Sequence, residues 1–410
     1  MANDRTVAVI GQGYVGLPLA IAAASHGWSV IGIDLSVDLV SQLNAGQSHI
    51  EDVSSTVLQS HLDAKLYRAS NNGDDVASVA ICVICVPTPL DSNRKPDLTF
   101  LESASKLIAP FVKSNALIIS ESTSFPGTVR DFVKPIFEKA RSDHAVELDF
   151  ASAPERVDPR NVHWEMSNTP RLVAGLTPRA TKRALDFYNS FCDQVIEVSS
   201  PEVAESAKLL ENTFRQVNIA LVNQLVPFCN AIGIDIREVI EAAGTKPYGF
   251  MKFFPGAGVG GHCIPIDPLY LLERARQFKV DLPFIESADI MNRQMPHYVA
   301  QRLIDLAKPV HGSTLAIIGV AYKSGISDVR ESPAMDVANY LQSQGYRVVW
   351  HDPLVKKFEN WEPLRMGETV AGAIIVTAQP SVDVLSITQG VIPTLDCTGK
   401  FKGIAGVVQL

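Results

Sequence analysis

The chain has 410 residues, of which 46% are hydrophobic and 20% are charged, with 36 basic against 44 acidic side chains and a formal net charge of −8. This composition supplies a large core and excludes intrinsic disorder. The acidic balance argues against nucleic-acid binding as the main role. Six cysteines are too few for a disulfide scaffold, and no run of 18 apolar residues predicts a membrane span. We therefore expect a cytoplasmic protein of two or three domains, with neither nucleic acid nor membrane as a partner.

The first 200 residues alternate short apolar runs with helical patterns. A helix is predicted over residues 14–26, and strands are predicted over residues 6–10, 29–33, 79–86, 117–120, 172–175 and 195–198. Strands that alternate with helices form βαβ units, and hence a parallel sheet covered by helices on both faces. Residues 1–200 are therefore expected to form one Rossmann-like domain.

The rest of the chain changes character twice. Residues 201–308 predict helices alone, over 201–232, 236–243, 269–279 and 283–306, so this part is a natural domain bridge or subunit interface. Residues 309–410 return to strands at 315–319, 347–350, 373–377 and 391–396, with a helix at 332–344. The predicted fold is α/β, with two Rossmann-like domains of parallel sheet joined by a long central helix and a helical middle domain.

A glycine fingerprint stands between the first strand and the first helix. Gly11, Gly13 and Gly16 form G-x-G-x-x-G, and Asp34 ends the next strand. Such a turn brings the backbone close to a pyrophosphate at the helix N-terminus. Asp34 would accept hydrogen bonds from a ribose 2′-OH and repel a 2′-phosphate, which favours NAD over NADP. The alternative is a turn needed only for packing.

The last domain repeats the order of strand, glycine, helix and strand ending in an acid, but without the glycine fingerprint. Lys323 lies in the corresponding loop, where it could neutralise a phosphate or simply be a solvated surface lysine. Its residue type alone leaves both interpretations open.

A single thiol lies in the glycine-rich segment 254–263. Cys263 precedes Asp267 and Pro268, which are predicted to be the N-cap and first residue of a helix. A helix N-terminus favours a thiolate, so Cys263 is a candidate nucleophile. The alternatives are an inert buried cysteine and an Asp267 that only caps the helix. Cys82 and Cys85 are expected on opposite faces of one strand, so no metal site is predicted there.

Lys208 and Asn212 lie four residues apart on the long predicted helix and therefore share a face, where they could hold an oxyanion. Glu205 lies on the same side. Taken alone, these residue types favour a solvated Glu–Lys stripe over a functional pair.

Seven sequence blocks distributed over most of the chain carry a family resemblance. They are GQGYVGLPLA from Gly11, VPTP from Val86, ESTSFPGT from Glu121, APERVDP from Ala153, AKLLENTFRQVNIALVNQL from Ala207, GGHCIPIDP from Gly260 and AYKSGISDVRESPA from Ala321. With these blocks the sequence resembles the nucleotide-sugar 6-dehydrogenases, the UDP-glucose and UDP-N-acetylhexosamine dehydrogenase superfamily.

The block around the thiol distinguishes branches of that superfamily. His262 precedes Cys263 where the glucose branch typically has Ser or Tyr, and Ile266 replaces a lysine of that branch. The block thus resembles the N-acetylhexosamine branch, and segments 246–250 and 253–256 resemble enzymes that act on UDP-N-acetylglucosamine. This ranks UDP-GlcNAc first, UDP-GalNAc and UDP-ManNAc next, and UDP-glucose last.

The resemblance implies a reaction and assigns roles. The C6 alcohol would be oxidised to a carboxylate with two NAD⁺ and water, through a thiohemiacetal and a thioester on Cys263. Lys208 and Asn212 would stabilise the oxyanion, Asp267 would position or activate water, and Thr123 and Glu155 would hold water near C6. Contacts with NAD are implied for Gly11, Gln12, Gly13, Tyr14, Val15, Gly16, Asp34, Thr88, Thr123 and Arg330. Contacts with the UDP-sugar are implied for Glu155, Arg156, Val157, Lys208, Asn212, Arg215, Lys246, Phe254, Gly256, Gly258, Gly260 and Lys323.

The resemblance also implies a homodimer, or a higher homo-oligomer, formed through the central helix, with Lys246 reaching a neighbouring subunit. Two other functions are compatible with the sequence. The chain could be a catalytically silent nucleotide-sugar binding protein of the same fold, or a simple two-electron NAD alcohol dehydrogenase that needs no thiol.

Overall fold

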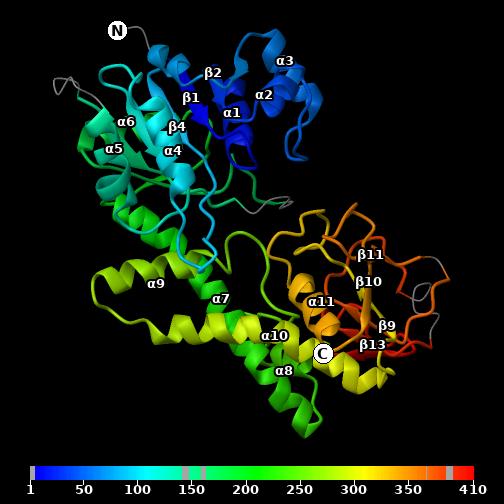
Figure 1. The fold of residues 1–410 in the computed structure, drawn as a ribbon. Coiled ribbons are helices and arrows are strands. Elements are labelled where there is room, and N and C mark those ends of the chain that lie inside the picture. Colours follow the sequence, from blue (N-terminus) through cyan, green and yellow to red (C-terminus); the bar gives the residue numbers. More distant parts are fainter. Residues whose placement is uncertain (1–4, 141–146, 158–162, 366, 385–390) are drawn as a thin grey trace. The chain divides into compact units, whose positions relative to one another are not determined.

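The computed structural model in Figure 1 describes residues 5–140, 147–157, 163–365, 367–384 and 391–410. The chain divides into two compact units. The first comprises Met1–Glu211 and Leu269–Phe278, and the second comprises Asn212–Pro268 and Lys279–Leu410.

An eight-stranded sheet organises the first unit, in the order β3-β2-β1-β4-β5-β6-β7-β8. Its strands are β1 Thr6–Ile10, β2 Ser29–Ile33, β3 Tyr67–Ser70, β4 Ile81–Ile84, β5 Leu117–Ser120, β6 Asp149–Ser152, β7 Arg171–Gly175 and β8 Val195–Glu197. Neighbouring strands are parallel except β6 and β7, which are antiparallel. The predicted parallel sheet is therefore confirmed with one exception.

Six α-helices and two short irregular helices accompany this sheet. They are α1 Gly16–Ser25, α2 Val37–Asn44, α3 Ser55–Asp63, α4 Thr99–Ile108, α5 Lys134–Ala140 and α6 Pro178–Tyr188, with the 3₁₀ helix η1 Gly73–Ser78 and the π-helix η2 Val129–Val133. The strand predicted over 79–86 is shorter, at Ile81–Ile84, because Val79 is taken up in the turn that ends η1. β6 was not predicted, since its first residue is the buried Asp149, which Arg183 neutralises at 2.7 Å.

Alternate residues of the strands enter two different hydrophobic clusters, as a doubly covered sheet requires. Val7 and Val9 pack in one cluster with residues of α1, α3 and α6. Ala8 and Ile10 pack in the other, with residues of α4 and α5. Cys82 and Cys85 are divided between these clusters, which confirms that they lie on opposite faces.

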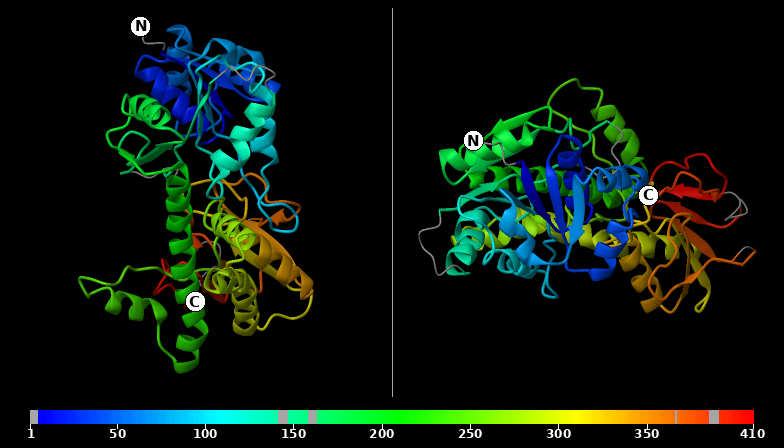
Figure 2. Two further views of the ribbon diagram at one scale, coloured as in Figure 1. Left: turned by 90° about the vertical axis from the view of Figure 1, so that its left-hand side faces the viewer. Right: turned by 90° about the horizontal axis from the view of Figure 1, so that it is seen from above.

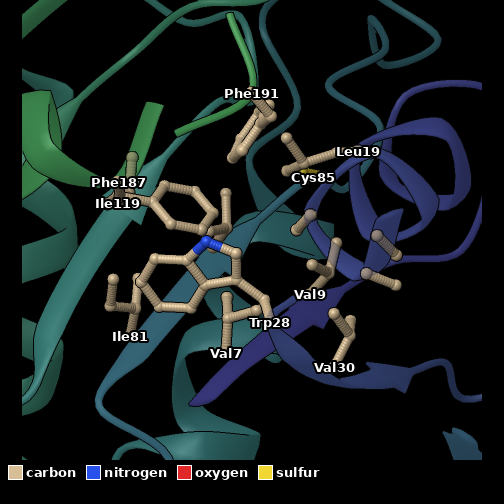
Figure 3. Packing of buried hydrophobic residues seen from close by; sticks show 14 of the residues in the cluster. Val7, Val9, Leu19, Trp28, Val30, Ile81, Cys85, Ile119, Phe187 and Phe191 are labelled. Atoms are coloured by element: carbon tan, nitrogen blue, oxygen red, sulfur yellow. The ribbon is translucent and has the colours of Figure 1, made fainter. Parts of the chain in front are cut away.

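Trp28 fills the centre of the first cluster (Figure 3). Its ring meets Phe187 edge-on, with centroids 4.9 Å apart, and its Nε1 donates to Ser190 Oγ at 2.9 Å. This side chain thereby joins the start of β2 to the end of α6.

Replacing Trp28 by alanine is expected to lower the free energy of unfolding of this unit by about 3–5 kcal/mol, because it removes buried aromatic area and leaves a cavity. Urea unfolding followed by circular dichroism measures the change. The matched control is Trp164→Ala, since Trp164 is 54% exposed. A loss no larger at Trp28 than at Trp164 would contradict the packing assigned here.

The regular elements of residues 201–308 are all helices, as predicted. They are α7 Pro201–Ile232, α8 Ile236–Ala243, α9 Asp267–Gln277 and α10 Pro283–Ala307. Figure 2 shows α7 as one uninterrupted helix, although Pro227 lies inside it. None of the described helices is by itself long and apolar enough to cross a membrane. Helices α7 and α8, with a bend of 119° between them, reach the required length and apolar composition only when taken together.

A second sheet has the order β11-β10-β9-β12-β13-β14, with every neighbouring pair parallel. Its elements are β9 Thr314–Ile318, α11 Pro333–Ser343, β10 Arg347–His351, β11 Glu362–Pro363, β12 Gly372–Ile375, β13 Thr394–Asp396 and β14 Val407–Gln409. The second Rossmann-like sheet is thus confirmed. The strand predicted over 391–396 begins only at Thr394, since Pro393 has no N–H to donate to a ladder.

Candidate functional site

The glycine loop of the first unit has the shape that a dinucleotide requires. Gly11 has φ +91°, and a Cβ there would lie 2.5 Å from the carbonyl oxygen of Cys85. A Cβ on Gly16 would lie 1.8 Å from the Gly11 carbonyl oxygen. A Cβ on Gly13, in contrast, would meet nothing within 4 Å, so this glycine leaves space beside the loop. The loop therefore fits a pyrophosphate placed at the N-terminus of α1.

Asp34 lies beside this loop at the end of β2. Its Oδ2 accepts the Gln12 amide at 2.9 Å and its Oδ1 accepts the Ser36 amide at 3.0 Å. The Gln12 side chain is fully buried, donating to the Val9 carbonyl and accepting from the Tyr67 hydroxyl. Gln12 thus braces the loop from inside, whereas Tyr14 is 45% exposed.

Glu155 is held from three directions. Its Oε1 accepts the backbone N–H groups of Arg156 and Val157, both at 2.6 Å, and its Oε2 accepts from Arg171 at 2.6 Å. Burial opposes ionisation, but Arg171, the Val157 amide and Lys208 outweigh it, so the pKa of Glu155 lies below its ordinary value. Glu155 is therefore a buried, charged carboxylate.

Arg171, Glu121 and Tyr188 form a hydrogen-bonded group with Glu155 that the sequence analysis does not predict. Arg171 also pairs with Glu121 at 2.8 Å, and the Tyr188 hydroxyl donates to Glu121 at 2.5 Å. Burial raises the pKa of Glu121 to about 7, since Arg171 offsets only part of the desolvation. Glu121 lies in the ESTSFPGT block, but Arg171 and Tyr188 carry no local signal, because their partners are distant in sequence.

The face of α7 that carries Lys208 is not a solvated stripe. Glu205 and Lys208 are 4% and 8% exposed, so the alternative of a surface Glu–Lys pair is wrong. Glu205 accepts the amides of Gly127 and Val129, at 2.6 and 3.1 Å, at the start of η2. Burial raises the pKa of Glu205 to about 8, although these two amides oppose the shift.

Asn212 and Asp267 meet in the second unit. Asn212 Nδ2 donates to Asp267 Oδ2 at 2.6 Å, and both side chains are buried. Helix α9 begins at Asp267 itself, so the predicted N-cap position is one residue off. The carboxylate therefore has a specific amide partner that a simple helix cap would not need.

Cys263 is the exposed cysteine, and the other five are buried. Its carbonyl oxygen accepts the amides of Ile266 and Asp267 at 3.2 and 2.9 Å, which places it in the turn that opens α9, as predicted. Burial raises the pKa of Cys82 to about 12 and that of Cys192 to about 11. Those thiols stay protonated, whereas Cys263 is accessible to a substrate.

The glycine segment before Cys263 packs closely against the loop that follows β9. A Cβ on Gly260 would lie 2.8 Å from Tyr322 Cβ, and His262 Nε2 lies 3.1 Å from Asp328 Oδ2. Asp328 also pairs with Arg330 at 2.7 Å. Of the predicted substrate residues of this segment, Gly260 packs on the loop that carries Lys323 and Arg330, and Gly258 faces Pro333 at the start of α11. Phe254 lies under the Arg237 guanidinium instead, and the Gly256 amide donates to Asn223 Oδ1 at 3.1 Å.

In the second sheet, Asp352 has the position that Asp34 has in the first. Its carboxylate accepts hydrogen bonds from its own domain. Asp352 Oδ2 accepts the amides of Val320 and Ala321 and the side chain of Gln379, at 2.9, 3.2 and 3.1 Å. The carboxylate therefore holds the turn after β9, whose sequence carries no glycine fingerprint.

The other predicted residues have simpler surroundings. Thr88 and Thr123 are half-buried in loops that follow β4 and β5. Arg156 is held by Glu211 at 2.6 Å, and Arg215 is exposed on α7. Lys246 is exposed and stacks on Tyr248 at 4.8 Å. Among the described residues, no cluster of three His, Cys, Asp or Glu side chains is placed to hold a metal ion.

A dinucleotide loop on one sheet and an exposed thiol beside another sheet are features of NAD-dependent dehydrogenases that act on nucleotide sugars. The chain belongs to the UDP-glucose/GDP-mannose dehydrogenase family. The family's NAD binding domain matches residues 5–192, its central domain matches residues 202–294 and its UDP binding domain matches residues 316–388.

Relatives with assigned substrates cover most of the chain. A UDP-N-acetyl-D-mannosamine dehydrogenase of Pyrococcus horikoshii is 35% identical over 85% of this chain and 84% of its own. An NDP-N-acetyl-D-galactosaminuronic acid dehydrogenase of Ralstonia solanacearum is 34% identical over 83% and 81%. The solved structure of a UDP-glucose dehydrogenase from Pyrobaculum islandicum is similar with a TM-score of 0.89 and 25% identity, and the match covers 98% of this chain and 96% of that chain. The chain is therefore an NAD-dependent UDP-sugar dehydrogenase.

Proposed function

We propose that this enzyme oxidises the C6 alcohol of a UDP-N-acetylhexosamine to the uronate through a covalent bond to Cys263. The observation that carries the proposal is the single exposed thiol, set in a glycine segment at the opening of α9, while the five other cysteines are buried. A thiolate is a strong nucleophile, and the helix N-terminus stabilises its negative charge.

The reaction balances with one alcohol, two NAD⁺ and one water giving one carboxylate, two NADH and three protons. The C6 alcohol first loses a hydride and a proton to become an aldehyde. The Cys263 thiolate then adds to the aldehyde carbon, and the resulting thiohemiacetal is tetrahedral and hence a good hydride donor. Loss of the second hydride leaves a thioester. Water attacks this thioester, the carbon–sulfur bond breaks, and sulfur leaves as thiolate.

The chain's own side chains supply charge and proton transfer for these steps. The Lys208 ammonium and the Asn212 amide stabilise the oxygen on which negative charge develops. Asp267, anchored by Asn212, takes up a proton as water is activated. Thr123 and Glu155 hold the hydrolytic water near C6, with Glu155 as proton acceptor.

The glycine loop supports NAD as the hydride acceptor. NAD⁺ held by this loop would supply the hydride acceptor for both oxidations. The backbone of residues 11–16 would hold the pyrophosphate, and Asp34 would accept hydrogen bonds from the ribose. Thr88, Thr123 and Arg330 are further proposed contacts with the cofactor.

The sugar is proposed to be an N-acetylhexosamine, because His262 precedes the thiol. Segments 246–250 and 253–256 support UDP-GlcNAc as the first candidate, with Arg156, Val157, Arg215 and Lys323 among its contacts. UDP-GalNAc and UDP-ManNAc are the next candidates. The substrate named for the Pyrococcus relative supports UDP-ManNAc, and the name of the Ralstonia relative supports an N-acetylgalactosamine sugar.

One assay tests both the reaction and the substrate. NADH formed per UDP-sugar consumed is measured with UDP-GlcNAc, UDP-GalNAc, UDP-ManNAc and UDP-glucose in parallel. Two NADH per sugar is the expected ratio. One NADH would indicate a simple alcohol dehydrogenase and none a binding protein. A preference for UDP-glucose would overturn the assignment to the hexosamine branch.

The organisation into residues 1–200 for NAD, 201–308 for dimerisation and 309–410 for the UDP-sugar belongs to this proposal. A stripe of exposed large side chains along α7 supports dimerisation through that helix. At 100° per residue the stripe is about 60° wide. Its members are Leu210, Phe214, Leu221, Leu225, Phe228 and Ile232, which are between 38% and 64% exposed. A second copy of α7 would cover such a continuous apolar face.

Placing a charge in this stripe is expected to separate the subunits. Leu221→Glu, at a position 54% exposed, would bury a carboxylate in the interface and yield monomers by sedimentation velocity. The matched control is Gln224→Glu on the same helix, which adds the same charge at an exposed polar position outside the stripe. An unchanged dimer in Leu221→Glu would show that the interface lies elsewhere.

A further inference from the structure

Arg171 occupies an unusual position for an arginine. It lies at the start of β7, is 3% exposed, and bridges two carboxylates, with Glu155 Oε2 at 2.6 Å and Glu121 Oε1 at 2.8 Å. Its guanidinium also stacks on the Tyr188 ring, 4.8 Å from the centroid. A buried arginine held in one orientation by three partners is expensive to desolvate, so the arrangement calls for a role beyond packing.

We infer that Arg171, braced by Glu121 and Tyr188, is the positioning residue that keeps the Glu155 carboxylate ionised and oriented for proton uptake during thioester hydrolysis. The inference rests on the proposed function, in which Glu155 holds the hydrolytic water. Arg171 itself touches neither substrate nor cofactor in this scheme.

The geometry separates the two carboxylates. Glu155 accepts two backbone amides at 2.6 Å in addition to Arg171. Glu121 shares Arg171 and accepts the Tyr188 hydroxyl, but its buried Oε2 has no hydrogen-bond partner among the described residues. Two carboxylates with one guanidinium favour uptake of one proton. Glu155 has more hydrogen-bond donors and therefore stays ionised, and Glu121 takes up that proton.

The pKa directions agree with this division. The pKa of Glu155 is lowered and that of Glu121 is raised to about 7. The other titratable groups around them are Lys208 on α7, Cys85 after β4 and Cys192 after α6, besides Tyr188 on α6. Burial raises the pKa of both cysteines, so they stay neutral, and Lys208 adds to the stabilisation of ionised Glu155.

The sign of the pH effect follows from the lowered pKa of Glu155. In the wild type this carboxylate stays charged as the pH falls below the ordinary glutamate pKa. Removing the Arg171 charge leaves Glu155 buried with less compensation, so its pKa rises and the acidic limb of the rate profile moves to higher pH. Loss of an adjacent arginine shifts a carboxyl pKa by about one to three units.

The test compares Arg171→Met and Arg171→Lys with the wild type, in kcat against pH and in stopped-flow NADH formation. In Arg171→Met we expect the acidic limb to move up by about one to three pH units. Hydrolysis should slow roughly 100-fold, the scale of general-base catalysis, giving an NADH burst and a thioester detectable by mass spectrometry. Arg171→Lys keeps the charge but loses the bridge, so a smaller shift of the same sign is expected.

Arg179→Met is the matched control, because this arginine is 44% exposed and its partner Asp149 stays paired with Arg183. This variant should leave the acidic limb of the pH profile unchanged and give no NADH burst. If Arg171→Met does not fold, Arg171→Lys alone decides. If a folded Arg171 variant keeps the acidic limb of the wild-type pH profile and accumulates no thioester, the inference is wrong. Failure of the proposed function is recognised separately, since the wild type would then yield fewer than two NADH per sugar.

Discussion

Cys263→Ser is expected to abolish sustained NADH formation from the UDP-sugar while leaving NAD binding nearly unchanged. A serine hydroxyl is not ionised near neutral pH, so the aldehyde is not converted into the tetrahedral adduct that donates the second hydride. Loss of a nucleophile lowers kcat by a factor on the order of 10⁴ or more. Steady-state absorbance at 340 nm, the NADH band, measures turnover, and fluorescence titration measures NAD affinity, which depends on the glycine loop of the first unit.

Cys229→Ser provides the matched control. Cys229 is 4% exposed on α7 of the same unit, and a serine inside a helix can donate to the carbonyl one turn earlier. Its turnover should stay close to that of the wild type. Normal turnover in Cys263→Ser would exclude the covalent mechanism, and equal losses in both variants would point to stability rather than chemistry.

Local patterns in the sequence were sufficient for most of the fold. Strands β1, β2 and β5 occupy the predicted residues because each is a short apolar run bounded by turn residues, and α7 spans the predicted 201–232. β3, β6, β11 and β14 are absent from the predicted strands. In β3 and β6, Arg68 and Asp149 break the apolar pattern. The charge of Asp149 is tolerated only because distant arginines neutralise it, and no local pattern reports that.

The candidate site divides in the same way. Gly11, Asp34 and Cys263 could be found from sequence, because a turn, a strand end and a helix start fix their surroundings locally. The sequence does not exclude a solvated surface position for Lys208, because its burial depends on tertiary packing. Arg171 went unnoticed because its partners Glu121 and Glu155 are 50 and 16 residues away along the chain.

Lys208→Met is expected to reduce kcat by roughly 10²–10³-fold, with a smaller effect on KM, because the oxyanion loses a preorganised positive charge. Lys208 is 8% exposed as a residue, lies one helical turn from Asn212, and stabilises ionised Glu155. Methionine keeps the length and apolar stem of lysine, so packing changes little. Initial rates over a range of UDP-sugar concentrations separate kcat from KM.

Lys182→Met on α6 is the matched control for the loss of a lysine. Its side chain is 75% exposed and, among the residues that the structure describes, pairs with Asp186 one turn along the same helix, so kcat should not change. Lys208→Arg retains the charge, but the planar fork of arginine cannot occupy the place of a compact ammonium, and only partial activity is expected. A wild-type kcat in Lys208→Met would remove this residue from the oxyanion role and leave Asn212 as the donor on α7.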